Sequence, residues 1–127
     1  MSTKYKFHDP DGTYFVTFAV VGWVDVFTRD EYRNIVINSF NYCIDKKGLV
    51  IHAWVIMTNH IHMIISRKGQ MLLEHIMRDM KKFTSIEIIH NIEKSTTESR
   101  RKWMISIFKA YGKAKVTTHW LCDSILH

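Results

Sequence analysis

Runs of apolar and β-branched residues predict three strands, over residues 13–21, 49–57 and 60–66. The turn signal Asp11-Gly12 precedes the first run, and only Thr58-Asn59 separates the second run from the third. Strands joined by so short a turn pair antiparallel. We therefore expect a β-hairpin near the middle of the chain.

Apolar residues that recur every three or four positions predict three helices, over residues 28–47, 71–93 and 98–109. Thr28 and Glu31 have the spacing of a capping box at the start of the first helix, and Gly48 is expected to end it. The periodicity of the third helix places three residues inward, namely Trp103, Ile107 and Phe108.

The predicted order is strand, helix, strand, strand, helix and helix, and residues 112–120 could begin a further strand. This order fits an α+β fold of the ferredoxin-like type, in which a split βαβ unit forms an antiparallel sheet with its helices on one face. Residues 1–127 form a single domain in this interpretation. The other face of the sheet is then free for a ligand.

Composition narrows the class of protein without changing the fold. Of the 127 residues, 46% are hydrophobic and 24% are charged, which is typical of a globular domain and argues against disorder. The two cysteines, Cys43 and Cys122, form neither a disulfide framework nor a four-cysteine zinc site. The N-terminus carries no apolar signal segment, and no apolar run has membrane-spanning length. We therefore expect a soluble cytoplasmic protein.

Positive charge is concentrated in the second half of the chain. The net charge is +6, and residues 1–66 contribute nothing to it because their acidic and basic side chains balance. The basic residues of the second half form three clusters: Arg67-Lys68, Arg78 with Lys81-Lys82, and Arg100-Arg101-Lys102. One-sided positive charge is typical of proteins that bind nucleic acid. The alternative is a solvated helical face.

His60 and His62 are the first candidates for chemistry. On a strand they point to the same side, with Cα atoms about 6.6 Å apart, while Ile61 points to the other side. Two imidazoles at that spacing can hold one metal ion and leave positions for a third ligand and for substrate oxygens. The alternative is a pair of surface histidines. If the turn at Thr58-Asn59 sets the register, His52 falls near Ile65, so we expect it to be structural.

Three blocks of sequence together carry a resemblance to a known family. They are Tyr14-Phe15-Val16-Thr17-Phe18, the stretch Val-Ile-Met-Thr-Asn-His-Ile-His-Met-Ile-Ile at residues 55–65, and Met80-Lys81-Lys82-Phe83-Thr84-Ser85. The chain resembles the tyrosine HUH transposases over about residues 13–110. The similarity is closest to the single-strand insertion-sequence transposases associated with repetitive extragenic palindromes.

The resemblance implies a DNA transposase with a ferredoxin-like domain, as a homodimer, that binds DNA hairpins and cleaves single-stranded DNA beside them. A tyrosine attacks the scissile phosphate, which leaves a 5′-phosphotyrosine and a free 3′-hydroxyl for strand transfer. His60 and His62 match the two metal-ligand histidines, for Mg²⁺ or Mn²⁺. Two imidazoles favour Mn²⁺ over Mg²⁺, which prefers oxygen ligands. Six basic residues are expected to contact DNA: Arg78, Lys81, Lys82, Arg100, Arg101 and Lys102.

One departure from the family concerns the nucleophile. The family's tyrosine lies on a C-terminal helix in a Tyr-x-x-x-Asn or Tyr-x-x-x-Gln context, and we expect that helix to be missing or altered in this chain. Tyr111 is the candidate that remains, because it is the only tyrosine on a late helix and is flanked by Lys109 and Lys113, although Lys115 stands where Asn or Gln is expected. The alternative is a plain aromatic residue at the end of a helix. Two other functions stay open: a non-catalytic domain that binds DNA hairpins, and a structural ferredoxin-like dimer module.

Overall fold

The computed structural model describes residues 7–112 and 121–126, and for residues 111, 112 and 121–126 it describes the backbone alone. Its elements, in chain order, are β1 (Tyr14–Val20), the 3-10 turns η2 (Val21–Trp23) and η3 (Val26–Thr28), α1 (Asp30–Lys47), β2 (Leu49–Ile56), β3 (His60–Arg67), α2 (Leu73–Lys94), α3 (Arg101–Gly112) and β4 (Leu121–Leu126).

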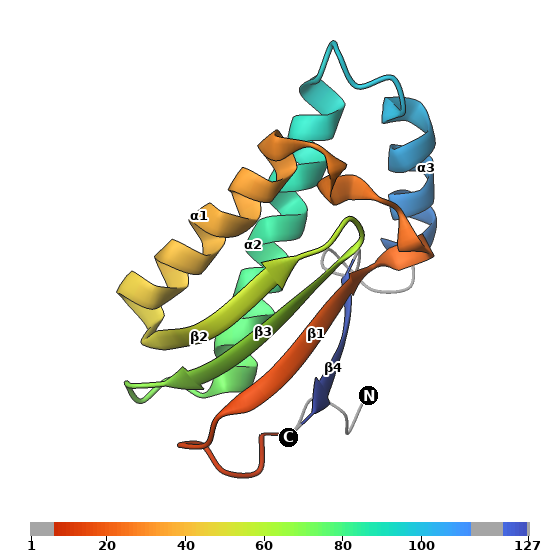
Figure 1. Cartoon of the computed structure of the whole chain (residues 1–127). Coiled ribbons are helices and arrows are strands. Elements are labelled where there is room, and N and C mark those ends of the chain that lie inside the picture. The colour runs from red at the N-terminus through yellow and green to blue at the C-terminus, as the bar shows by residue number, and fades with distance from the viewer. Residues whose placement is uncertain (1–6, 113–120, 127) are drawn as a thin grey trace.

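The strands form a four-stranded sheet in the order β2-β3-β1-β4, and each neighbouring pair is antiparallel. β1 and β2 are joined through α1 and lie on either side of β3, which is the split βαβ arrangement. α1 and α2 cover one face of this sheet (Figure 1). The α+β, ferredoxin-like fold is therefore confirmed. The last strand lies at 121–126, beyond the expected 112–120, of which 113–120 are outside the described residues.

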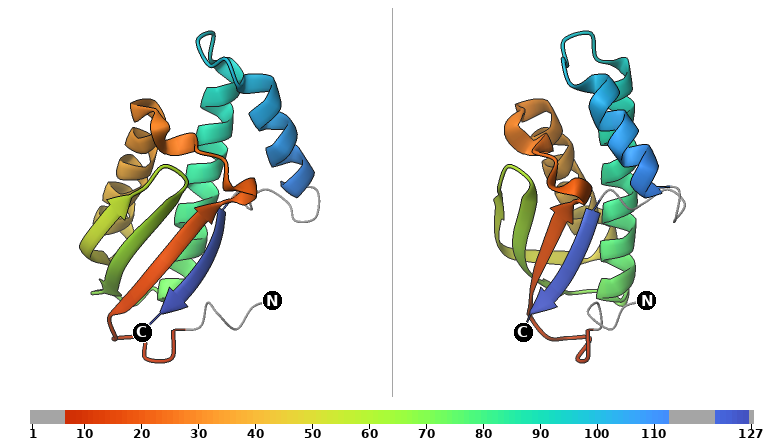
Figure 2. Two further views of the ribbon diagram at one scale, coloured as in Figure 1. Left: turned by 45° about the vertical axis from the view of Figure 1, so that its right-hand side comes forward. Right: turned by 90° about the vertical axis from the view of Figure 1, so that its right-hand side faces the viewer.

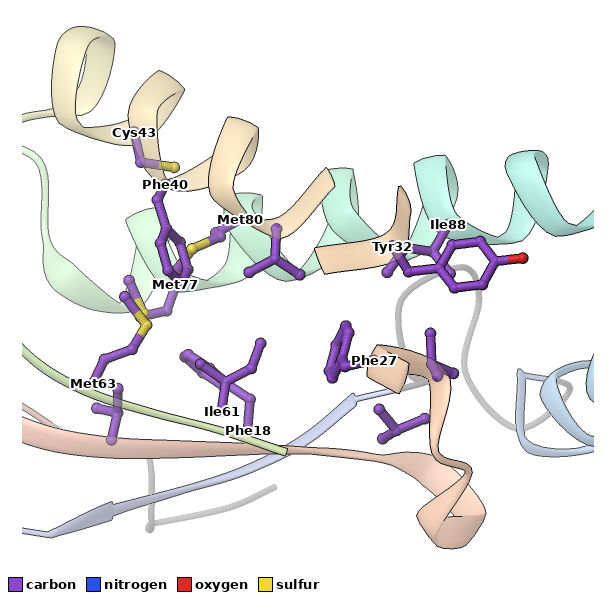
Figure 3. Close-up of a cluster of buried hydrophobic side chains, with 14 of the residues drawn as sticks. Phe18, Phe27, Tyr32, Phe40, Cys43, Ile61, Met63, Met77, Met80 and Ile88 are labelled. Atoms are coloured by element: carbon purple, nitrogen blue, oxygen red, sulfur yellow. The ribbon is translucent and has the colours of Figure 1, made fainter. Parts of the chain in front are cut away.

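The core lies between the sheet and its two covering helices (Figure 3). Alternate residues of β1 and β3 point into it, including Phe18, Ile61 and Met63, which are all at most 3% exposed. From α1, Tyr32, Phe40 and Cys43 meet them, together with Met77, Met80 and Ile88 from α2. This alternation fixes which residues of the two strands face away from the helices.

The ends of α1 show one correct and one wrong expectation. Gly48 ends the helix in a left-handed conformation (φ 78°), and a Cβ there would lie 3.0 Å from the Gly69 nitrogen, so glycine is needed for two reasons. The capping box is wrong. Thr28 belongs to η3, and its hydroxyl donates to the Asp25 carbonyl, so it does not cap α1. The residue at the N-cap position is Arg29, which provides no side-chain cap.

The buried face of α3 agrees with the expected one at Phe108, includes Ile107 only in part and differs at Trp103. Met104 and Phe108 are buried, whereas Trp103 is 52% exposed. The reason is that α3 packs against α2 and against η2. Phe83 on α2 is likewise exposed, and Thr84 and Ser85 are buried in its place. Ser85 satisfies its hydroxyl by donating to the Lys81 carbonyl, 2.7 Å away. None of the described helices combines the length and the apolar character of a membrane span.

Candidate metal and nucleic-acid site

The two histidines lie side by side at the start of β3. Their ring centroids are 4.7 Å apart with the planes at 81°, and both side chains are partly exposed. Ile61 between them is buried on the opposite face, under the helices. The shared open face therefore agrees with the strand spacing, and metal binding itself stays a prediction.

In both rings, Nδ1 lies within hydrogen-bond distance of a neighbouring side chain. Asn59 Oδ1 lies 2.8 Å from His60 Nδ1, and because an amide oxygen only accepts, Nδ1 carries the proton. His62 Nδ1 lies 2.9 Å from Thr17 Oγ1, a hydroxyl that can accept from a protonated Nδ1 or donate to a deprotonated one. In the tautomer with the proton on Nδ1, the lone pair of a neutral ring is on Nε2, where a metal ion can bind. Metal-ligating histidines are commonly oriented through the other ring nitrogen in this way.

Apolar neighbours surround His62. The Phe15 ring stacks on it at 5.4 Å, and Val55 faces it across the β2–β3 pair. Burial lowers the pKa of His62, and the positive charge of a protonated His60 lowers it further. Both effects favour the neutral imidazole, which is the form that binds metal.

The donor set fits a divalent metal ion that takes nitrogen ligands. Two neutral imidazoles suit Mn²⁺ or a later transition metal better than Mg²⁺. No group of three or more His, Cys, Asp or Glu side chains comes together as a metal site within the described residues. The described part of the chain therefore offers two ligands, and the remaining positions would be filled from elsewhere.

The predicted DNA contacts on α2 lie on the other side of the sheet from the histidines. α2 covers the face into which Ile61 points (Figure 2). Arg78 bonds to its neighbour Asp79 at 3.1 Å, and Lys82 is exposed. Lys81 lies at the edge of the core, where it lines a small gap with Phe18. The structure thus does not bring these three basic residues together with His60 and His62.

The predicted contacts around α3 divide into two kinds. Arg100 is engaged by carboxylates, at 2.5 Å from Asp25 and 3.2 Å from Glu98. Arg101 and Lys102 instead line a surface cavity of about 640 Å³ together with Lys109. Arg101 keeps one bond to the Ser95 carbonyl at 2.8 Å. Three basic side chains and one acidic side chain, Glu93, therefore meet at this surface cavity.

Glu98 is the centre of a buried polar cluster. Its carboxylate is fully buried and accepts from Tyr32 Oη at 3.2 Å, besides lying 2.8 Å from Arg29 and 3.2 Å from Arg100. Burial alone raises the pKa of Glu98, but the hydrogen bonds from Arg100 and the charges of Arg100 and Arg29 outweigh it, so the pKa lies below its ordinary value. The cluster ties the α2–α3 connection to the start of α1.

The candidate nucleophile is placed only in part. Tyr111 lies in the last turn of α3, and its side chain is outside the described residues, as are Lys113 and Lys115. α3 packs against α2 and touches η2, which follows β1 at the end of the sheet where β3 begins. Helix α3, on which Tyr111 lies, is thus adjacent to the end of the sheet that carries the histidines.

His52 lies apart from the pair, as the register predicts. It is the extra residue of a β-bulge between Ile51 and Ala53, and its Nε2 is 2.8 Å from the Ser66 hydroxyl. His52 is exposed and lies away from His60 and His62, so its structural role stays a prediction.

Sequence reasoning missed the side chains that orient the histidines. Thr17 comes from a different strand, and only its register with His62 reveals the contact. The sequence pattern identifies Asn59 only as a turn residue. A signal was present for both, because Thr17 alternates with buried residues on β1 and Asn59 directly precedes His60.

Comparisons with known proteins place this geometry in context. The model of the family described as "Transposase IS200 like" matches residues 13–118. Among solved structures, a REP-associated tyrosine transposase bound to a REP hairpin is similar, with a TM-score of 0.56 and 15% identity. The match covers 100% of this chain and 63% of that one, and at this identity it concerns the fold. No curated protein matches by sequence.

Proposed function

Since this chain belongs to the IS200-like transposase family, we propose that it binds DNA hairpins and cleaves adjacent single-stranded DNA with a divalent ion held by His60 and His62. The observation that carries the proposal is the histidine pair, whose rings lie 4.7 Å apart on the open face with Nδ1 of each already bonded. The hairpin bound by the structurally similar transposase supports the choice of substrate.

The chain's own residues would act mainly by positioning. His60 and His62 would hold the ion through Nε2, with Asn59 and Thr17 keeping each ring in the required tautomer. When bound, such an ion polarises a phosphate oxygen and stabilises the charge that develops there. Phe15 and Val55 would limit the access of water to the phosphate next to His62.

In the proposed reaction a tyrosine oxygen attacks phosphorus while the bond from phosphorus to the 3′ oxygen breaks. The phenol gives up its proton, the departing 3′ oxygen gains one, and the 5′ end stays on the enzyme as a phosphotyrosine. We assign this role to Tyr111 because it lies on α3, which contacts η2 at the end of the sheet where β3 begins. Attack by the 3′-hydroxyl of another strand reverses the step and completes strand transfer.

The basic cavity at α3 would bind the hairpin backbone. Arg101, Lys102 and Lys109 line it together, so their charges act on one stretch of phosphates. The α2 residues Arg78 and Lys82 lie on the far side of the sheet from the histidines and would contact a different part of the DNA. Binding through phosphates weakens steeply with salt, and we expect a loss between about 50 and 200 mM.

The test is a cleavage assay on a labelled DNA hairpin with a single-stranded flank, in Mn²⁺. His60→Ala and His62→Ala are expected to lower the cleavage rate at least ~100-fold, because each removes a ligand. His52→Ala is the matched control, since it changes an exposed histidine on the neighbouring strand and should cleave as the wild type does. Equal activity in all three variants would overturn the proposal.

A second function, hairpin binding without cleavage, is favoured by one observation. Within the described residues, no third His, Cys, Asp or Glu side chain joins His60 and His62. This function predicts that the wild type binds the hairpin with the same affinity with and without Mn²⁺ and leaves the flank intact. The structural dimer module predicts no hairpin binding even at low salt. The homodimer remains a proposal in each case, and light scattering on the purified protein measures it.

A further inference from the structure

Trp23 is the most exposed large hydrophobic side chain among the described residues. Its side chain is 67% exposed, although Val21 and Val24 on either side are at most 5% exposed. The backbone is therefore anchored in the core while the indole projects into solvent. A single exposed tryptophan alone would not indicate a function, so its backbone and its surroundings decide what it does.

The backbone at Trp23 is in a conformation that bulky residues avoid. Its φ is 56°, and in the described chain it is the one residue other than glycine with positive φ. Gly22 before it also has positive φ, 68°, so the chain makes two left-handed steps in succession. Strain of this kind persists where the surrounding structure holds it, and it concentrates at binding and catalytic sites.

Asn59 connects Trp23 to the histidine pair. Its amide nitrogen donates to the Trp23 carbonyl at 3.4 Å, and its amide oxygen accepts from His60 at 2.8 Å. The Asn59 carbonyl also accepts from the Val20 amide at 3.0 Å, and the Thr58 carbonyl accepts from the Phe27 amide at 2.9 Å. The β2–β3 turn thus fixes both ends of the segment that carries the tryptophan.

The indole lies directly beside the proposed phosphate site. Its ring centroid is 6.4 Å from that of His60, with the planes at 78°. An exposed indole face at this distance can accept a planar base from a strand whose phosphate is held at the histidines. Stacking on an aromatic ring suits any base, because every base has a π-face.

We propose that Trp23 stacks on the nucleobase next to the phosphate bound at His60 and His62, and so positions the single-stranded flank for cleavage. This inference rests on the proposed function. It assigns Trp23 a role in binding the flank that is largely independent of base identity, whereas the α3 cavity would bind the hairpin. Loss of one base–indole stack is expected to weaken binding of the flank roughly 5- to 100-fold.

The experiment measures the affinity of two oligonucleotides in Mn²⁺, without relying on turnover. One is a hairpin with a single-stranded flank, and the other carries one abasic position in that flank, moved step by step along it. Trp23→Asn removes the indole and tolerates positive φ, so it keeps the fold. Trp23→Phe keeps an aromatic face. Trp54→Leu is the matched control, because Trp54 is 51% exposed but packs against Phe40 on the helix side.

For the wild type we expect one abasic position to weaken binding strongly, and Trp23→Asn to weaken binding of the intact flank to the same extent. In Trp23→Asn, the abasic substitution should then weaken binding little further. Trp23→Phe should retain most of the wild-type affinity and Trp54→Leu all of it. Thermal unfolding should show Trp23→Asn at least as stable as the wild type, because the strain is relieved.

Three results separate the failure of this inference from the failure of the proposed function. If Mn²⁺ and the histidines govern binding of the flank in the wild type but Trp23→Asn binds it equally well, the stacking role is wrong and the proposed function stands. If abasic and Trp23→Asn effects simply add at every position, stacking is also excluded. If the flank contributes no affinity in the wild type and His60→Ala changes nothing, both are wrong.

Discussion

The histidine pair and the Glu98 cluster are both groups of polar side chains built from distant segments, yet they differ in how their bonding is completed. In the Glu98 cluster both carboxylate oxygens meet donors from the same chain, Arg29, Arg100 and Tyr32. In the histidine pair the chain supplies one partner for each ring, at Nδ1, and no hydrogen bond at Nε2 is found for either ring within the described residues.

This difference indicates what each group is for. A buried charge whose hydrogen bonds are satisfied internally costs much to disrupt, so the Glu98 cluster contributes to holding α3 in place. A partly exposed pair of imidazoles contributes little to folding and is available to a ligand. Substitutions should therefore act on stability in one region and on binding in the other.

The largest effect is expected from Glu98→Ala. Removing the carboxylate takes away the partner of Arg29 and Tyr32 and leaves Arg100 with Asp25 alone. We expect a loss of about 3 kcal/mol in the free energy of unfolding, measured by urea denaturation. Glu93→Ala, which changes an exposed carboxylate on α2, should stay within about 0.5 kcal/mol of the wild type. A similar loss in His62→Ala would contradict the distinction between the two regions.

The next largest effect is expected from Thr17→Val, which keeps the branched shape but removes the hydroxyl bonded to His62. We expect Mn²⁺ affinity to fall about 10-fold or more, because the ring loses the partner that fixes its tautomer. Calorimetric titration with Mn²⁺ measures this. Thr13→Val, an exposed threonine just before β1, is the control and should bind Mn²⁺ as the wild type does.

A smaller effect on DNA binding distinguishes two neighbouring basic residues. Lys102→Gln should weaken hairpin binding a few-fold and reduce the slope of log affinity against log salt by about 1, since it removes one phosphate contact. Arg100→Gln should instead lower stability and leave that slope unchanged, because Arg100 is engaged by Asp25 and Glu98. Binding titrations at several salt concentrations would contradict the assignment if the two variants behaved alike.

The smallest effect is the response of stability to acid. The pKa of Glu98 is lower in the folded protein than in the unfolded chain, so the unfolded chain binds the proton first as the pH falls. The stability from this group is fully present above the unfolded pKa, about 4.3, and is lost as the pH falls through the folded pKa. Urea unfolding between neutral and acid pH should show a smaller pH dependence in Glu98→Gln than in the wild type.

Much of the fold could be predicted from local pattern alone. The alternation of β1 and β3, the stop at Gly48 and the short turn at Thr58-Asn59 all depend on neighbours in sequence, and the structure agrees with them. The expectations that failed depended on packing. Thr28 bonds within η3 instead of capping α1, and Trp103 is exposed because contact with α2 selects Met104 and Phe108.

The amino-acid sequence by itself determined the order of the elements, the shared face of His60 and His62 and the excess of positive charge, because backbone periodicity and composition are local properties. Only the tertiary structure decided which side chains accompany them. Thr17 contacts His62 through strand pairing, and Arg100 contacts Asp25, which is 75 positions away in the sequence. The sheet separates the basic residues of α2 from the histidines. Contacts of this kind depend on how distant segments pack, which no local pattern encodes.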